Sequence, residues 1–217
     1  MALQAEREEA LAARVERVLA PLTGNERALD AGCGTGALAF ALAPHVREVV
    51  GVDSSPQLLA AGRARAPLNV TLLPGDATAL PFEVGSFDLA GCLRVLHHVR
   101  RPELVISELA RVTRPGGCIL VVDQLGDADP LRAIQVDRFE RARDASHTRL
   151  LPDGDIRALL EANDLVVSRN EVVREARELE RYLDLAAVSE DVREEVRALA
   201  PAPVFEVEIG WYVARKR

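Results

Sequence analysis

Residues 29–36 read Leu-Asp-Ala-Gly-Cys-Gly-Thr-Gly, and this stretch decides the fold. A short predicted strand, Arg27–Ala31, precedes the glycines, and a predicted helix from about Thr35 to Ala43 follows them. Gly32 and Gly34 remove side chains where a ligand must approach the backbone closely. The start of the helix offers free N–H groups and a partial positive charge. The stretch therefore predicts a binding loop between a buried strand and a helix.

Three carboxylates narrow the choice of ligand, because the loop alone also satisfies the loose dinucleotide pattern G-x-G-x-x-G/A. Asp53 follows a second predicted strand, where a carboxylate can accept hydrogen bonds from both ribose hydroxyls. Asp30 precedes the first glycine, where a negative charge disfavours a pyrophosphate and suits an ammonium group. Asp76 can accept from an adenine amine, and the backbone of Ala77 can donate to a ring nitrogen. Each carboxylate could instead cap a helix or build a turn. Together they predict a ligand with an amino-acid end, a ribose and an adenine.

Strands and helices alternate along most of the chain, which is typical of a parallel sheet covered by helices. Further strands are predicted at Glu48–Val52, Val70–Leu73, Phe87–Cys92, Cys118–Asp123 and Leu165–Val173. Helices are predicted at residues 2–19, 129–143, Pro102–Val112, Asp153–Glu161, Glu175–Tyr182 and Ser189–Leu199, and after Asp53. The last strand, residues 205–213, alternates apolar and polar residues, which predicts an antiparallel strand at or near a sheet edge with one wet face.

Composition indicates one globular domain over residues 1–217. Of these residues, 48% are hydrophobic and 28% charged, with a net charge of −7. The acidic balance argues against a nucleic-acid partner, and no apolar run is long enough to span a bilayer. The three cysteines share no metal-ligand spacing and fit reduced thiols, so we expect a cytoplasmic protein with no metal site and no membrane partner. A homodimer is left open.

The chain resembles the class I S-adenosylmethionine-dependent methyltransferases, and especially the small-molecule branch related to ubiquinone and menaquinone biosynthesis. The resemblance rests on LDAGCGTG at 29–36, GVD at 51–53, GDATALPF at 75–82, FDLAGCLRVLHHV at 87–99 and RVTRPGG at 111–117. It implies an α/β, Rossmann-like sheet of seven mostly parallel strands in the order 3-2-1-4-5-7-6. The last strand is antiparallel, and helices lie on both faces. It also implies S-adenosylmethionine as the cofactor, with Ser54 and Leu93 joining the binding residues above.

The candidate catalytic residues form two sets, one after the fourth strand, where the ligand crevice of such a sheet opens, and one, Arg143 and His147, in the irregular region between the fifth and sixth strands. His98 is a natural base near neutral pH, although it and His97 could simply start a helix or pack beneath a lid. Arg143 could grip an acidic substrate, or could pair with Asp144 at the surface. Together with His147 it falls in the stretch 140–147, ERARDASH, which is similar to an E-R-D-x-S-H segment of a bacterial subgroup of these enzymes.

We therefore expect O- or C-methylation of a small molecule. Two alternatives are a non-catalytic, cofactor-binding regulatory protein of the same fold and a nicotinamide-dependent oxidoreductase. Asp30 and Asp76 argue against the second, as does the missing catalytic Tyr/Lys pair. We also expect two segments, residues 1–24 with their helix at 2–19 and residues 125–150, to act as a lid over Asp53 and His98. The alternative is that the helix packs on the outer face of the sheet.

Overall fold

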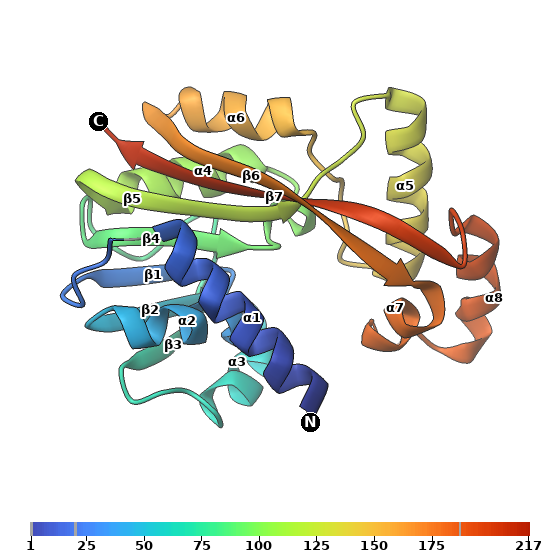
Figure 1. Ribbon diagram of the computed structural model, residues 1–217, viewed down its shortest axis with the longest axis horizontal. Coiled ribbons are helices and arrows are strands. Elements are labelled where there is room, and N and C mark those ends of the chain that lie inside the picture. The colour runs from blue at the N-terminus through green and yellow to red at the C-terminus, as the bar shows by residue number, and fades with distance from the viewer. Residues whose placement is uncertain (1, 20, 187) are drawn as a thin grey trace.

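A seven-stranded sheet forms the centre of the structure, a computed structural model that describes residues 2–19, 21–186 and 188–217. The strands lie in the order β3-β2-β1-β4-β5-β7-β6 (Figure 1). β7 is antiparallel to both of its neighbours, and the other adjacent strands are parallel. The strands are β1 Arg27–Ala31, β2 Glu48–Asp53, β3 Val70–Pro74, β4 Phe87–Leu93, β5 Thr113–Gln124, β6 Leu165–Glu178 and β7 Val204–Lys216. The predicted strand order and the antiparallel last strand are confirmed.

Helices cover both faces of the sheet and enclose two hydrophobic cores. One core gathers buried residues of α1 (Ala2–Leu19), α2 (Ala37–Leu42) and α3 (Pro56–Arg63). The other gathers buried residues of α4 (Pro102–Val112) and α6 (Asp153–Glu161). Two short 3-10 helices, η1 (Ala43–His45) and η2 (Leu96–His98), complete this part of the chain.

Backbone conformation sets where the first helices begin. Gly34 and Gly36 both have positive φ, +55° and +93°, so α2 begins at Ala37 rather than at the predicted Thr35. α3 begins at Pro56, whose fixed φ suits a first helical position, and the Ser55 hydroxyl caps it by accepting from the Leu58 N–H.

The last strand differs from its prediction on one face. β7 lies beside the edge strand β6, as expected, but Tyr212 is fully buried although its face was predicted to be wet. Its ring joins the core beneath α6, and its hydroxyl donates to Asp153 Oδ1 at 2.7 Å. Alternation of polar residues could not reveal this, because a buried tyrosine needs only one hydrogen-bond partner at its tip.

β6 is longer than predicted and reaches past the sheet. Gln124, the last residue of β5, and Val173 of β6 both pair with Ile209 of β7. Residues 174–178 therefore extend beyond the end of β5 and pair only with β7. The helix predicted at Glu175–Tyr182 is thus wrong in its first turn, and α7 spans Leu179–Leu185.

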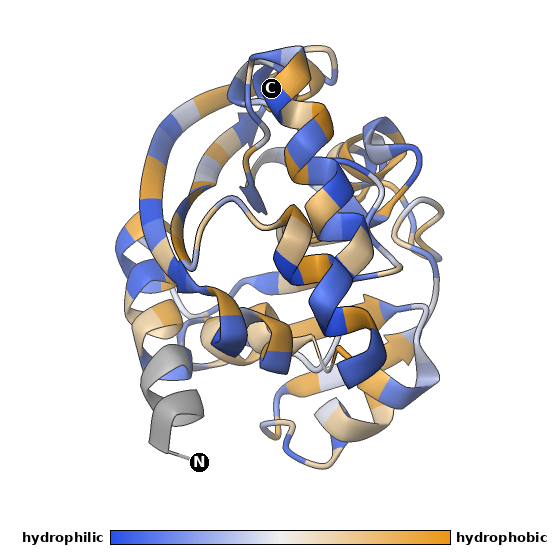
Figure 2. Ribbon diagram, turned by 90° about the vertical axis from the view of Figure 1, so that its right-hand side faces the viewer, coloured by the Kyte–Doolittle hydropathy of each residue, from blue (hydrophilic) through white to orange (hydrophobic). Residues whose placement is uncertain are grey.

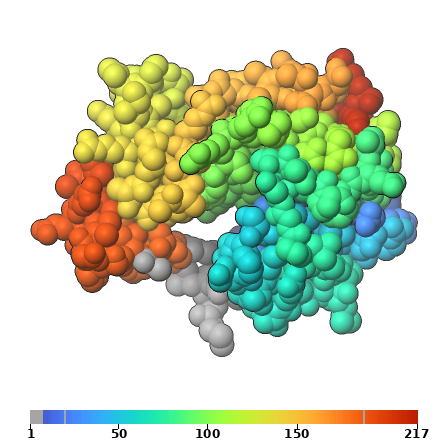
Figure 3. Space-filling model, turned by 180° about the vertical axis from the view of Figure 1, so that it is seen from behind, coloured from blue at the N-terminus to red at the C-terminus, as the bar shows by residue number. Residues whose placement is uncertain are grey.

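A small lobe forms around the extended parts of β6 and β7. It consists of α5 (Pro130–Arg143), α7 and α8 (Glu190–Leu199), and these helices carry both hydrophobic and hydrophilic residues (Figures 1 and 2). Its own core holds Phe139, Tyr182 and Phe205, whose rings meet edge to face or tilted at 5.6–6.3 Å. The space-filling view shows the molecule hollowed between the α7 and α8 side of this lobe, in orange, and the segment near α3, in cyan (Figure 3).

The second half of α1 packs beside α2 on the sheet. Val15 and Val18 are buried there, and Arg14 lies over the Trp211 ring, 4.9 Å from its centroid. Arg65, beyond α3, forms an ion pair with Glu8 near the other end of the helix. The second half of α1 thus packs on the outer face of the sheet, which was the alternative to a lid. A lid role for residues 1–24 or for residues 125–150 remains a prediction.

Candidate functional site

The predicted binding residues gather at one edge of the sheet. β1 pairs in parallel with β2 on one side and β4 on the other, and Asp30 is in register with both Gly51 and Gly91. The strands therefore end together, which brings the glycine loop after β1, Asp53 at the end of β2 and Leu93 at the end of β4 to the same edge. Leu93 is partly exposed there. This edge is where open α/β sheets bind ligands.

The two loop glycines are required for different reasons. Both have positive φ, +73° at Gly32 and +55° at Gly34. A Cβ on Gly32 would lie 2.5 Å from the Val95 side chain, so this glycine makes room for packing within the protein. A Cβ on Gly34 would meet only Leu58, at 3.9 Å. The backbone at Gly34 therefore faces open space, which a ligand can use.

Asp53 ties the loop to the next helix. Its Oδ2 accepts the Gly34 N–H at 2.7 Å, and its Oδ1 accepts the Ser55 N–H at 2.8 Å. The carboxylate is partly exposed, and Ser54 beside it is exposed. Because a carboxylate has about four acceptor positions, Asp53 can hold the loop and still accept from ligand hydroxyls.

Asp30 lies beneath the loop and is 1% exposed. Its Oδ2 accepts the Ala39 N–H near the start of α2 at 2.9 Å, whereas its Oδ1 is buried without a hydrogen-bond partner among the described residues. Burial raises the pKa of this carboxyl to about 7, with a smaller contribution from the charge of Asp53, while the hydrogen bond from Ala39 opposes the rise. Asp30 therefore caps the start of α2 through Oδ2, and its Oδ1 remains without a hydrogen-bond partner among the described residues.

Asp76 builds a turn after β3. Its Oδ1 accepts both the N–H and the hydroxyl of Thr78, at 2.8 and 2.7 Å, and the side chain is exposed. Ala77 beside it is buried. This matches the turn-building alternative for Asp76, and its contact with an adenine remains a prediction.

Three histidines come together after β4. The rings of His97 and His98 are 4.1 Å apart, and His147 lies 5.7 Å from His97. His147 is buried and bonded through Nε2 to Asp137 at 2.8 Å. His97 Nδ1 is bonded to Asp123, a buried residue at the end of β5. The sequence analysis missed Asp123, although a carboxylate that ends an apolar strand is a visible signal.

His98 is held in one tautomer by its neighbours. The Ser146 hydroxyl donates to Asp144 at 2.6 Å, so its oxygen must accept from His98 Nδ1, 2.9 Å away. His98 Nε2 is then the unprotonated nitrogen. Burial, and secondarily the neighbouring His97, lower the pKa of His98 from its ordinary value. His98 is therefore a neutral base at neutral pH.

Arg143 is part of a network in the lobe rather than a partner of Asp144. Its Nε donates to Glu140 at 2.9 Å, and its guanidinium lies over the Tyr182 ring, 4.1 Å from the centroid. Glu140 is 2% exposed and also accepts from the Tyr182 hydroxyl and from Gln124 at the end of β5. The sequence analysis did not find Glu140, Tyr182 or Gln124, because their contact depends on how the lobe folds back.

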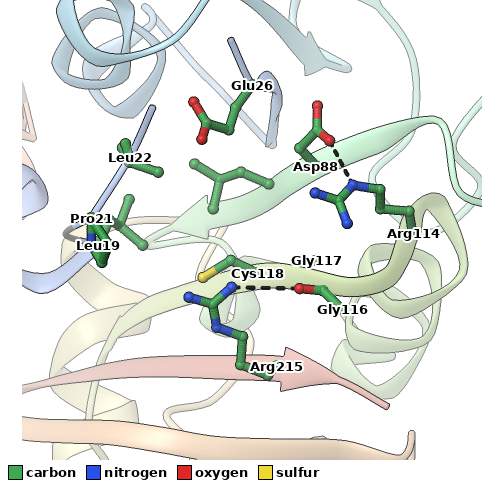
Figure 4. A pocket seen from close by; sticks show the side chains of 11 residues that line it. Leu19, Pro21, Leu22, Glu26, Asp88, Arg114, Gly116, Gly117, Cys118 and Arg215 are labelled. Atoms are coloured by element: carbon green, nitrogen blue, oxygen red, sulfur yellow. Dashed lines mark hydrogen bonds and ion pairs between the residues drawn. The ribbon is translucent and has the colours of Figure 1, made fainter. Parts of the chain in front are cut away.

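The opposite edge of the sheet has a small cavity of about 60 Å³. It lies where β4 and β5 begin, between Asp88, Arg114, Arg215 and the buried side of Glu26 (Figure 4).

Across the described ranges, no group of three or more His, Cys, Asp and Glu side chains could hold a metal ion. No helix in the described part of the chain is long and apolar enough to cross a membrane.

The raised pKa of Asp30 predicts a pH effect on stability. The folded chain keeps a proton that the unfolded chain releases between pH 3.8 and about 7, so this group's contribution to stability falls as pH rises through that window. Asp30→Asn has no such proton to lose. We expect the variant to gain stability relative to the parent as pH rises, in urea unfolding followed by circular dichroism. Parallel pH curves would contradict the assignment.

Comparisons with known proteins find similar sequences and a similar fold. The methyltransferase domain family matches residues 29–121. The "uncharacterized methyltransferase YcgJ" of Bacillus subtilis (strain 168) is 34% identical over 143 residues, which cover 64% of this chain and 56% of that protein. Its crystal structure superposes with a TM-score of 0.89 at 23% identity, covering 96% of this chain and 99% of that one.

Two further relatives extend the family. The "uncharacterized protein YafE" of Escherichia coli (strain K12) is 31% identical, over 63% of this chain and 68% of that protein. A demethylmenaquinone methyltransferase of Renibacterium salmoninarum is 34% identical over 57% of this chain and 52% of its own length. The matches thus span about half to two thirds of these relatives' lengths, and they give no support to the regulatory or nicotinamide alternatives. The chain belongs to the methyltransferase domain family.

Proposed function

We propose that this chain binds S-adenosylmethionine at the carboxyl ends of β1, β2 and β4 and transfers its methyl group to an oxygen or carbon of a small molecule. The observation that carries the proposal is the open space at Gly34, whose backbone is held in place by Asp53. A loop fixed by a carboxylate, with no side chain to obstruct it, is a preformed cradle for a ligand.

The polar groups around this cradle suit the cofactor. Asp53 would accept from the ribose hydroxyls, with Ser54 beside it, and Asp76 and Ala77 would bind the adenine. The unpartnered oxygen of Asp30 suits a nearby ammonium group, which would favour the charged form of this carboxyl. When bound, the cofactor supplies an activated methyl group, so the protein needs mainly to align the acceptor and exclude water.

His98 would remove the acceptor's proton where the acceptor keeps one. Its Nδ1 donates to Ser146, which in turn donates to Asp144, so the ring is oriented with Nε2 free to accept. The lowered pKa keeps this nitrogen unprotonated near neutral pH. His147 would act by holding the segment around Ser146 through its bond to Asp137.

The cysteines bear on where the protein works. The three cysteines are buried and free, which fits a reducing compartment, and we propose a cytoplasmic enzyme with a small-molecule substrate. The relatives named demethylmenaquinone methyltransferases suggest a quinone-like acceptor as one candidate. A homodimer and the absence of a nucleic-acid partner remain predictions.

Gly34→Ala tests the cradle. The added methyl group would enter the space that the cofactor needs, so we expect calorimetry to show at least about a tenfold loss of affinity for S-adenosylhomocysteine. Gly24→Ala is the matched control, because Gly24 also has positive φ, +82°, and open space around it, but lies before β1. Equal affinity in the two variants would show that the loop has only a structural role.

His98→Gln tests the base. With an acceptor found by screening for release of S-adenosylhomocysteine, we expect kcat to fall by about a hundredfold while cofactor affinity is unchanged. In the parent, kcat should fall at acid pH with a midpoint below the ordinary pKa of histidine, since burial lowers that of His98. His45→Gln in η1 is the control. Full turnover by His98→Gln would remove this residue from the mechanism.

A further inference from the structure

Three arginines meet where the lobe faces the sheet. Arg94 follows β4 directly, Arg177 lies in the extended part of β6, and Arg143 ends α5. Arg94 and Arg177 both contact the same oxygen of Glu175, Arg94 at 3.3 Å. Arg143 and Arg177 both lie near the Tyr182 ring, with centroid distances of 4.1 and 5.7 Å. Arg177 is thus linked to Arg94 through Glu175 and to Arg143 through Tyr182, and the three arginines are called the cluster below.

Direct ion pairs do not give every arginine of the cluster its own carboxylate. Its three guanidinium groups are matched by two carboxylates, Glu175 and Glu140. Glu140 is further occupied by the Tyr182 hydroxyl and the Gln124 amide, so it has little capacity for a second arginine. The direct contacts thus leave one guanidinium group without a carboxylate of its own, while Asp123 and Asp144 add negative charge near Arg94 and Arg143 at longer range.

One donor of the cluster also has no acceptor. Arg177 Nε is buried and makes no hydrogen bond within the described residues, while its side chain is only 15% exposed. A buried N–H that has lost water without gaining a partner is unfavourable, and for a charged group more so. A bound anion would satisfy it.

The cluster lies beside the expected position of methyl transfer. Residues 174–178 extend past the carboxyl end of β5, which places Arg177 and Glu175 above the same edge as the cofactor cradle. Arg94 is the residue directly after Leu93, at the end of β4. The contact between Arg94 and Glu175 therefore spans this edge from β4 to β6.

We propose that Arg94, Arg143 and Arg177 bind a carboxylate group of the methyl acceptor. This inference rests on the proposed function, since it names the substrate class of the same site. A planar carboxylate matches the fork of a guanidinium, and one of its oxygens can accept the unpartnered Arg177 Nε–H. A phosphate dianion would leave negative charge uncompensated. The arginines would hold the acceptor's carboxylate while a separate oxygen or carbon of the acceptor faces the methyl donor.

Acetate is the smallest probe of such a site, and acetamide is its neutral counterpart of the same shape. Nitrogen-15 NMR of the full chain, saturated with S-adenosylhomocysteine, would follow the Arg177 Nε–Hε signal during titration with each compound at constant ionic strength. We expect a saturable shift with acetate and none with acetamide. In the Arg177→Gln variant the Arg177 signal is absent, so acetate binding is followed through the Arg94 and Arg143 signals. We expect this variant to bind acetate at least about tenfold more weakly.

Arg174→Gln is the matched control. Arg174 lies on the same strand and pairs with Glu208, but its side chain is 70% exposed, and it should leave acetate binding unchanged. No saturable shift with acetate, equal shifts with acetamide, or equal losses in the two variants would each overturn the carboxylate site. Calorimetry with S-adenosylhomocysteine separates the two claims. Cofactor binding without acetate binding would contradict only this inference, whereas no cofactor binding would contradict the proposed function.

Discussion

The hydrogen bond from the Gly34 N–H to Asp53 is the interaction on which the site depends. It joins the loop after β1 to the end of β2, and the same carboxylate accepts the Ser55 N–H at the start of α3. One side chain therefore fixes the loop, the strand end and the helix start relative to one another. Because Gly34 has no side chain and faces open space, this fixed backbone can contact a ligand without rearrangement, and the binding free energy is not spent on ordering the loop.

The lobe adds side chains that we propose contact the methyl acceptor. The sheet edge has carboxylates and backbone donors suited to the cofactor, but few groups for an acceptor. Extension of β6 and β7 past the end of β5 carries α5, α7 and α8 to this edge, and the Glu140 network fastens the lobe to Gln124 of β5. Removing Glu140 alone would leave a buried tyrosine hydroxyl and an arginine without their acceptor, so the network both holds the lobe and orients Arg143.

The sheet could be predicted from the sequence because its signals are local. Apolar strands, glycines and turn residues recur in a fixed order, and the strand ends carry the carboxylates at 30, 53 and 76. In the last two strands, where prediction failed, the deciding contact was distant in sequence. The first turn expected at Glu175–Tyr182 is strand because it pairs with residues 204–207, and Tyr212 is buried because α6 covers it.

The same limit applies to the candidate site. His98, Arg143 and His147 were chosen from their positions, but their partners lie on other elements. The Ser146 hydroxyl that fixes the tautomer of His98 is 48 residues away, and Tyr182 beneath Arg143 lies on another helix. Gly32 and Gly34 look equivalent in the sequence, and only the structure shows that a Cβ would clash with Val95 at Gly32 and meet open space at Gly34.

The central claim is that this loop, fixed by Asp53 and underlain by Asp30, is built for S-adenosylmethionine rather than for a dinucleotide. Calorimetric titration of the unmodified protein with S-adenosylhomocysteine and, separately, with NAD tests it most directly. We expect saturable binding of one S-adenosylhomocysteine per chain and no heat of binding with NAD. Binding of NAD, or failure to bind S-adenosylhomocysteine, would contradict it.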